Sequence, residues 1–193
     1  MEHPINHSPY SGFLELSWPG KNNSIVFKDG KWIMLPNDCQ LSYRALLYEK
    51  ELGSGENIIG YAVDADQLTG LASLKSYMLS KIQLIYFDAP RLKVFQSASI
   101  SGYTTSTWLS LLRQTAVNAI PLLTKNGFFV LHTDEEMSHY ARMVLEEIFG
   151  KNHYVGTLAW QKQYAPQNDL NIPTDVLDYI IVLAKILLIT FPK

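Results

Sequence analysis

The segment from Leu84 to Arg91 constrains the fold of this chain more than any other. It begins within Ile82–Phe87, an almost continuous apolar run that is typical of a strand in a parallel sheet covered on both faces. The run ends in an acidic residue, Asp88, and a proline turn at Pro90. Side chains at the carboxyl ends of parallel strands face the crevice where α/β proteins bind ligands. The sequence therefore places Asp88 in a candidate site.

Extended and helical patterns alternate from about residue 58 onward. We expect strands at Ile58–Val63, Ile82–Phe87, Phe128–His132, Tyr154–Lys162 and Asp178–Leu188. We expect helices at Ala65–Leu79, Thr107–Thr124 and from Thr133 to Gly150. Asn126-Gly127 is expected to end the second helix, and Thr133 with Glu136 to form a capping box for the third. The last two strands are joined by a polar segment without a helix, so the pattern indicates an α/β sheet that ends in an antiparallel pair.

Residues 1–60 lack a clear periodicity, and we interpret them as an N-terminal extension ahead of a domain at 61–193. Within the extension, Ser24–Phe27 and Lys31–Leu35 are expected to form a short hairpin around Lys28-Asp29-Gly30. Leu41–Leu52 has helical spacing of its apolar residues.

Composition excludes several classes of protein. Hydrophobic residues make up 47% of the 193 residues and charged residues 18%, which indicates a globular chain. The formal net charge of -2 gives no bulk attraction to nucleic acid, although four cations face one acid between Lys81 and Arg113. The single Cys39 excludes an internal disulfide and a cysteine-rich zinc site. The apolar Ile180–Phe191 is short and interrupted by Lys185, so we expect a buried strand, no membrane span and a cytoplasmic protein.

Several motifs in one order resemble the amino-methyltransferases that modify adenine or cytosine in DNA. They are, in chain order, Ala65–Leu68, Asp88–Arg91, Thr105–Arg113, Gly127–Asp134, His139–Gly150, Ala159–Tyr164 and Asp178–Val182. The order matches the class in which the catalytic motif precedes the cofactor-binding segment, and modification subunits of type III restriction systems are the most similar kind. The resemblance covers about residues 61–185. It implies a partial, Rossmann-like methyltransferase sheet and an adenine-specific DNA methyltransferase, with cytosine left open.

The resemblance also implies a catalytic turn formed by Asp88, Ala89, Pro90 and Arg91. In the family this turn reads Asp-Pro-Pro-Tyr, so Ala89 replaces a proline and Arg91 the tyrosine. The carboxylate of Asp88 and the carbonyl of residue 89 would accept hydrogen bonds from the target amine, which is presented on a base taken out of the duplex. Alanine frees one backbone N–H. Arg91 would contact the base or a phosphate in place of the aromatic platform.

S-adenosylmethionine is the methyl donor that the resemblance implies, and Asp66 is the residue expected to contact it. The family holds the donor mainly through a Phe-x-Gly-x-Gly turn, and none follows Tyr179. The glycines at Gly53 and Gly55 follow a helix-like stretch and are interpreted as a loop. We therefore expect a truncated or split chain that is inactive alone, and a second chain that carries the donor-binding half or a restriction subunit.

Double-stranded DNA is the expected substrate, with Trp160, Lys162 and Tyr164 as candidate contacts. A tryptophan in a strand can equally belong to the core. A metal site is conceivable with His132, Asp134 and His139 as ligands, but Asp134 is better explained as part of a helix cap. Two alternatives stay open: a non-catalytic DNA-binding or regulatory protein derived from such an enzyme, and a poorly folding product with an exposed sheet edge.

Overall fold

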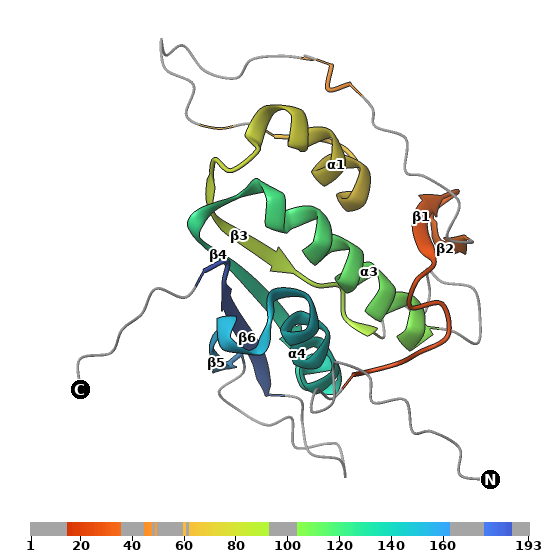
Figure 1. The fold of residues 1–193 in the computed structure, drawn as a ribbon. Helices are drawn as coiled ribbons and strands as arrows, with labels where there is room; N and C mark the ends of the chain where they lie inside the picture. The colour runs from red at the N-terminus through yellow and green to blue at the C-terminus, as the bar shows by residue number, and fades with distance from the viewer. Residues whose placement is uncertain are drawn as a thin grey trace, which may run out of the picture.

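The computed structural model describes residues 15–35, 45–47, 49, 60, 62–92, 104–162 and 176–186. Its centre is a four-stranded sheet formed by β3 (Ile82–Asp88), β4 (Leu123–Asp134), β6 (Leu177–Ala184) and β5 (Tyr154–Gln161), in that spatial order. Strands β3 and β4 are parallel, whereas β4–β6 and β6–β5 are antiparallel. The α/β fold, with a partial Rossmann-like sheet ending in an antiparallel pair, is confirmed (Figure 1).

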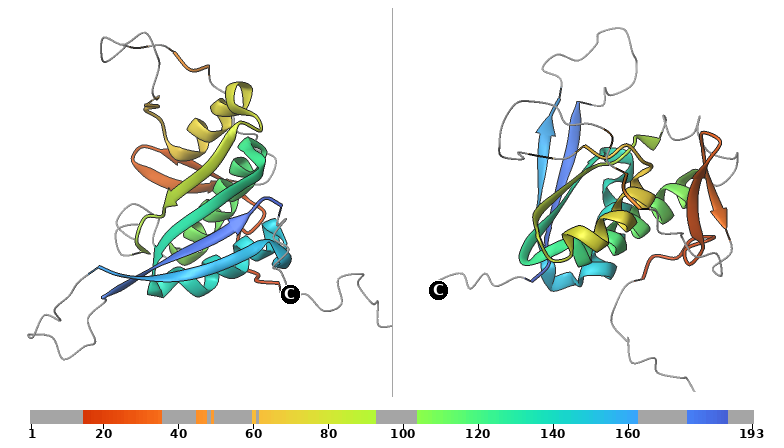
Figure 2. Two further views of the ribbon diagram at one scale, coloured as in Figure 1. Left: turned by 90° about the vertical axis from the view of Figure 1, so that its left-hand side faces the viewer. Right: turned by 90° about the horizontal axis from the view of Figure 1, so that it is seen from above.

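Three helices lie on one face of this sheet: α1 (Gln67–Met78), α3 (Thr104–Ala119) and α4 (Glu135–Phe149) (Figure 2). Two short 3-10 turns, Ile120–Leu122 and Lys151–His153, connect α3 to β4 and α4 to β5. The helix-facing side chains of the sheet form the core, because alternate residues of a strand point to the same face. Buried residues of this core include Trp108, Leu111, Phe129, Leu131, Met137, Leu145, Ile181 and Leu183.

The opposite face of the sheet is not covered by any helix among the described residues (Figure 2). It carries large apolar side chains that remain exposed: Leu84 and Tyr86 on β3, Phe128 on β4, and Leu158 and Trp160 on β5. The apolar run of β3 predicts two covered faces, whereas the described part of the chain covers one. The side chain of Asp88 follows Leu84 and Tyr86 at a spacing of two, so it lies on this open face.

The hairpin of β1 (Ser24–Lys28) and β2 (Lys31–Leu35) packs against α3 on the side away from the sheet (Figure 2). Asp29 and Gly30 both have positive φ, as a two-residue type I′ turn requires, and the predicted hairpin is confirmed. Ile25 is fully buried. The indole of Trp18 donates a hydrogen bond of 2.9 Å to Ser110 Oγ, which ties this region to α3.

Two boundaries differ from the prediction. Helix α3 ends at Ala119 because Pro121 follows, so β4 begins at Leu123 and Asn126-Gly127 lies within the strand instead of ending the helix. The pairing of β3 with β4 jumps from Ile82–Leu123 to Leu84–Phe128, which accommodates the extra residues. The cap of α4 is Asp134 rather than Thr133, since Asp134 Oδ1 accepts a hydrogen bond of 3.1 Å from Met137 N.

Two predicted elements lie largely outside the described residues. Gly60, Ala62 and Val63 are the described part of the expected strand Ile58–Val63, and they are not in a strand. The expected helix at Leu41–Leu52 is described only at residues 45–47 and 49, which are not helical. Within the described ranges, no helix has both the length and the apolar character needed to cross a membrane.

Candidate functional site

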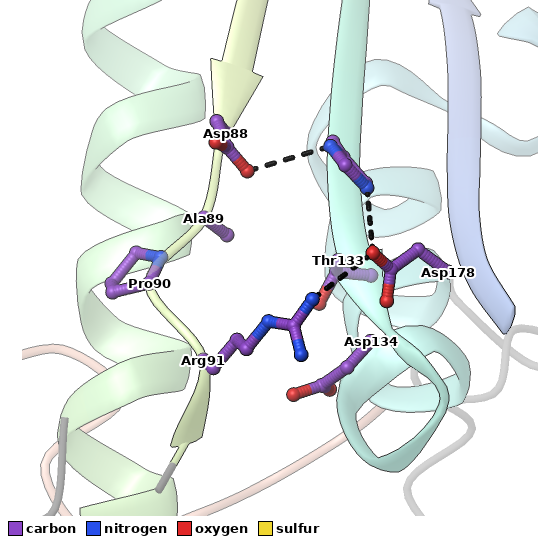
Figure 3. A pocket seen from close by; sticks show the side chains of 8 residues that line it. Asp88, Ala89, Pro90, Arg91, Thr133, Asp134 and Asp178 are labelled. Atoms are coloured by element: carbon purple, nitrogen blue, oxygen red, sulfur yellow. Dashed lines mark hydrogen bonds and ion pairs between the residues drawn. The ribbon is translucent and has the colours of Figure 1, made fainter. Parts of the chain in front are cut away.

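An open pocket of about 290 Å³ lies at the carboxyl ends of the parallel strands β3 and β4 (Figure 3). It is lined by Asp88, Ala89, Pro90, Arg91, His132, Thr133, Asp134 and Asp178. The structure thus brings the whole predicted turn, Asp88–Arg91, into one pocket at the edge of the sheet where α/β proteins bind ligands. Its volume is close to the lower end of the range for small-molecule sites, roughly 300 Å³.

The backbone of the turn is held from both sides. Ala89 N donates a hydrogen bond of 3.0 Å to the carbonyl of His132 on β4. The N–H that alanine restores at this position is therefore satisfied. The carbonyl of Pro90 accepts a hydrogen bond of 2.7 Å from the indole of Trp108, a buried residue of α3. These two contacts fix the turn between the sheet and the helix layer.

Asp88 projects from the end of β3 with its side chain 75% exposed. Its Oδ1 atom lies 3.5 Å from Nδ1 of His132. This distance is long for a hydrogen bond. The carboxylate oxygens are therefore accessible from the pocket, as an acceptor for a ligand amine requires.

Asp178, at the start of β6, is the charged centre of the pocket. Its carboxylate, 7% exposed, accepts from Lys162 Nζ at 2.7 Å and from Arg91 Nη2 at 3.2 Å, and His132 Nε2 lies 3.2 Å away. Burial alone raises the pKa of Asp178. The hydrogen bond and charge of Lys162, the charge of Arg91 and the hydrogen bond from His132 outweigh burial, so the pKa lies below its ordinary value.

Arg91 reaches across the pocket to Asp178 (Figure 3). Its side chain is 50% exposed. The position that the resemblance assigns to a stacking aromatic is therefore occupied by a planar cation anchored to a buried carboxylate.

The three candidate DNA contacts fall in different surroundings. Trp160 is 58% exposed on the open face of the sheet, and its backbone pairs with that of Asp178, so it is not a core residue. Lys162 is mostly buried and is engaged by Asp178. Tyr164 lies outside the described residues.

Asp66 is not part of this pocket. It is the N-cap of α1, where Oδ1 accepts a hydrogen bond of 3.0 Å from Thr69 N. It also lines a second, largely apolar cavity of about 240 Å³, between α1 and β3, whose walls include Leu71, Ile85 and Tyr86. A carboxylate and apolar walls suit part of a nucleoside-containing donor. The volume of this cavity is below the roughly 300 Å³ of a complete ligand site.

The metal alternative finds no support among the described residues, where no group of three potential ligands is close enough to hold an ion. His132 and Asp134 line the Asp88 pocket, whereas His139 does not and its Nδ1 lies 3.3 Å from Ser138 Oγ.

Asp178 and His132 are the two site residues whose roles the sequence does not reveal. The sequence marks Asp178 only as part of a motif, and His132 only as a possible metal ligand. The sequence does contain one indication for Asp178, because an acidic residue near the start of an apolar strand needs a hydrogen-bond or charge partner when it is buried. Its partners, at separations of 16, 46 and 87 residues, have no signature in the sequence.

Comparisons with known proteins agree with the resemblance in the sequence. No family model matches the chain. It is 30% identical over 98 residues to the Mod subunit of the type III restriction-modification enzyme StyLTI from Salmonella typhimurium, covering 51% of this chain and 14% of that protein. It is 22% identical over 187 residues to the type II methyltransferase M.EcaI from Enterobacter cloacae, covering 92% of this chain and 39% of that protein.

Among solved structures, the chain overlays on a Thermus thermophilus protein described as a DNA modification methylase, with a TM-score of 0.46 and 14% identity, covering 62% of this chain and 50% of that one. The complex of the same protein with S-adenosyl-L-methionine gives a TM-score of 0.42 and 16% identity, covering 66% and 56%. Overlays at this level carry no conclusion about function. The chain is therefore similar in sequence to DNA methyltransferases, and it spans well under half the length of the two curated relatives.

Proposed function

We propose that residues 61–193 form the amine-binding part of a site-specific DNA methyltransferase that uses S-adenosylmethionine and modifies adenine. The observation that carries the proposal is the exposed carboxylate of Asp88, at the end of a parallel strand in a pocket with Ala89, Pro90 and Arg91. The similarity to DNA methyltransferases supports the same reaction class.

In this proposal Asp88 accepts a hydrogen bond from the exocyclic amine of a base that has left the duplex. The carbonyl of Ala89 accepts a second one. Two acceptors orient the nitrogen lone pair away from the turn and toward the incoming methyl group, which lowers the cost of reaching a reactive geometry. Trp108 and the carbonyl of His132 hold the turn in place during this step.

S-adenosylmethionine supplies an electrophilic methyl group when it is bound. The amine nitrogen would bond to that methyl carbon while the bond from the carbon to sulfur breaks, and the surplus amine proton would pass to solvent. Asp66 and the apolar walls of the second cavity would contact part of the donor, because this cavity adjoins β3. We propose that a second chain, either a donor-binding half or a restriction subunit, completes the enzyme, so that this chain alone does not methylate DNA.

The amine-binding role is tested by NMR titration of the chain with deoxyadenosine monophosphate at millimolar concentration. We expect shifts confined to the turn Asp88–Arg91 and its neighbours. They should be lost with the N6,N6-dimethyl analogue, which has no N–H to donate, and in Asp88→Ala, but kept in Asp64→Ala, an exposed aspartate outside the pocket. Equal shifts with the dimethyl analogue, or no shifts in the pocket, would overturn the proposal. Deoxycytidine monophosphate tests the choice of base.

Dependence on a second chain is tested by transfer of tritiated methyl groups to unmethylated DNA. The purified chain is expected to show none. Transfer by the chain alone that Asp88→Ala abolishes would overturn this part of the proposal, while supporting the role of Asp88.

A second candidate is a non-catalytic DNA-binding or regulatory protein, and the position of Arg91 favours it. An arginine side chain that is half exposed and anchored to Asp178 offers a contact for phosphate or base. This function predicts DNA binding without a methyl donor that weakens as salt increases and in Arg91→Ala. The absence of measurable binding at low salt would remove it.

A further inference from the structure

His132 lies between the two carboxylates of the pocket and links them. Its Nε2 is 3.2 Å from Oδ2 of the buried Asp178, and its Nδ1 is 3.5 Å from Oδ1 of the exposed Asp88. The same Nδ1 is 2.8 Å from the hydroxyl of Tyr86. The ring is mostly buried, and β3 and β6 supply groups on either side of it. It is therefore oriented by defined contacts and is not a loosely placed surface histidine.

These contacts select one tautomer of the neutral ring. A carboxylate only accepts hydrogen bonds, and the lowered pKa of Asp178 keeps it ionised at neutral pH, so Nε2 must carry the proton. Nδ1 is then an acceptor, and the hydroxyl of Tyr86 donates to it. Burial and the charges of Asp88 and Asp178 raise the pKa of Tyr86, so the hydroxyl keeps its proton. Every group in this chain of contacts has a compatible role.

The tautomer has a consequence for Asp88. In the neutral ring Nδ1 carries no proton and accepts from Tyr86, so it donates nothing to Asp88, and both carboxylate oxygens remain available as acceptors. When the ring gains a second proton, Nδ1–H becomes a donor with two acceptors nearby, the hydroxyl oxygen of Tyr86 at 2.8 Å and the charged carboxylate of Asp88 at 3.5 Å. A charge-assisted hydrogen bond would then compete with an amine ligand for Asp88.

Several charged and polar groups surround His132. Among the described residues, Tyr86 and Asp88 face it from β3 and Asp178 faces it from β6. Lys162 and Arg91 contact Asp178 and offset part of its negative charge. The net electrostatic effect on the ring depends on this whole group, whereas the donors and acceptors in contact with the two ring nitrogens set the tautomer.

We propose that His132 is a positioning residue that controls whether Asp88 can accept an amine: the neutral ring, held by Asp178, leaves Asp88 available, and the protonated ring engages it. This rests on the proposed function for the role of the amine. The arrangement of Asp178, His132 and Asp88 stands independently of it. The site with a neutral ring would thus bind an amine, and the site with a protonated ring would not.

The first test is nitrogen-15 NMR of the imidazole rings in the full chain at neutral pH, with His132→Gln to assign the signal. We expect the Nε2–H tautomer for His132. His153 is an internal control, because its Nδ1 lies 3.1 Å from the carbonyl of Ala184 and must donate, giving the Nδ1–H tautomer. A neutral His132 with its proton on Nδ1 would overturn the proposal. Tyr86→Phe should move the Nδ1 signal and keep the tautomer.

The second test follows the carboxyl carbon of Asp88 as the pH is lowered. Its signal should shift together with protonation of His132, and this step should vanish in His132→Gln, while Asp64 shows no such step in either protein. Identical curves for Asp88 in both proteins would overturn the proposal. If nucleotide binding fails at every pH while these signals behave as expected, the proposed function is wrong and the positioning contact stands.

Discussion

Nζ of Lys162 lies 2.7 Å from Oδ1 of Asp178. Lys162, which directly follows β5, therefore balances the negative charge of the buried carboxylate near the start of β6. The same carboxylate holds Arg91 and His132, which belong to the turn after β3 and to β4. One side chain therefore joins all four strands at the end of the sheet that carries the pocket. Asp178 therefore holds together the charged groups that line the pocket.

Removing this carboxylate should destabilise the fold. Asp178→Ala removes the anion that Lys162, Arg91 and His132 all contact. We expect the free energy of unfolding to fall by about 3 kcal/mol, the magnitude measured when one member of a buried ion pair is removed. Urea unfolding measures it, with Asp64→Ala as the exposed control. A loss below about 0.5 kcal/mol, typical of a surface substitution, would contradict the prediction.

Acid should weaken the same interaction. The pKa of Asp178 is lower in the folded protein than its ordinary value of 3.8. Its contribution is therefore complete above that value and is lost as the pH falls through the lower, folded pKa. We expect the unfolding free energy that Asp178 contributes to decline as the pH falls below that ordinary value. This decline should be shallower in Asp178→Asn. Equal acid slopes in the two proteins would show that Asp178 is not a source of the pH dependence.

The indole of Trp108 should stabilise the proposed catalytic turn. Trp108→Phe keeps an aromatic ring in the core but removes the indole N–H that donates to the carbonyl of Pro90. We expect a loss of about 2 kcal/mol from the unpaired acceptor and the smaller ring. Trp160→Phe is the matched control, because that indole lies on the open face. Urea unfolding of the two variants compares their losses of unfolding free energy. A larger loss in Trp160→Phe than in Trp108→Phe would contradict the stabilising role of the Trp108 indole.

Gly127 should not tolerate a side chain. A Cβ at this position would lie 3.1 Å from the carbonyl oxygens of Ile82 and Thr124, where backbone cannot move cheaply. We expect Gly127→Ala to cost about 2 kcal/mol of unfolding free energy, as overpacking does. Gly156 is the control, since a Cβ there meets nothing within 4 Å. If Gly127→Ala were as stable as Gly156→Ala, the close approach of β3 to β4 would be wrong.

The open face of the sheet should bind apolar dyes. Leu158→Lys and Leu84→Lys remove exposed apolar area from it without altering the core, so they should lower the fluorescence of bound anilinonaphthalene sulfonate and reduce self-association. Tyr77→Lys, at an exposed aromatic on α1, should leave dye binding unchanged. An equal loss of fluorescence in all three variants would contradict a sheet-specific patch.

Helices and strands with strong local patterns were predictable. The apolar stripe that ends at Gly150 predicts α4, and the φ of 95° at Gly150 matches the preference for glycine at a helix end. The apolar run of Ile82–Phe87 predicts β3. Errors arose where local signals compete: Asn126-Gly127 looks like a helix stop, yet Pro121 ends α3 earlier. Thr133 and Asp134 are both good caps, and the hydrogen-bond geometry selects Asp134.

The sequence by itself determined the alternation of strands and helices, and it placed Asp88 at the end of a parallel strand, because hydrophobic periodicity and turn residues act over a few neighbours. Only the tertiary structure decided that β6 lies between β4 and β5, and hence that Asp178 meets His132 and Arg91 across 46 and 87 residues. It also decided that one face of the sheet stays open among the residues that the structure describes. Such pairings depend on how whole elements pack, and no local segment of the chain encodes them.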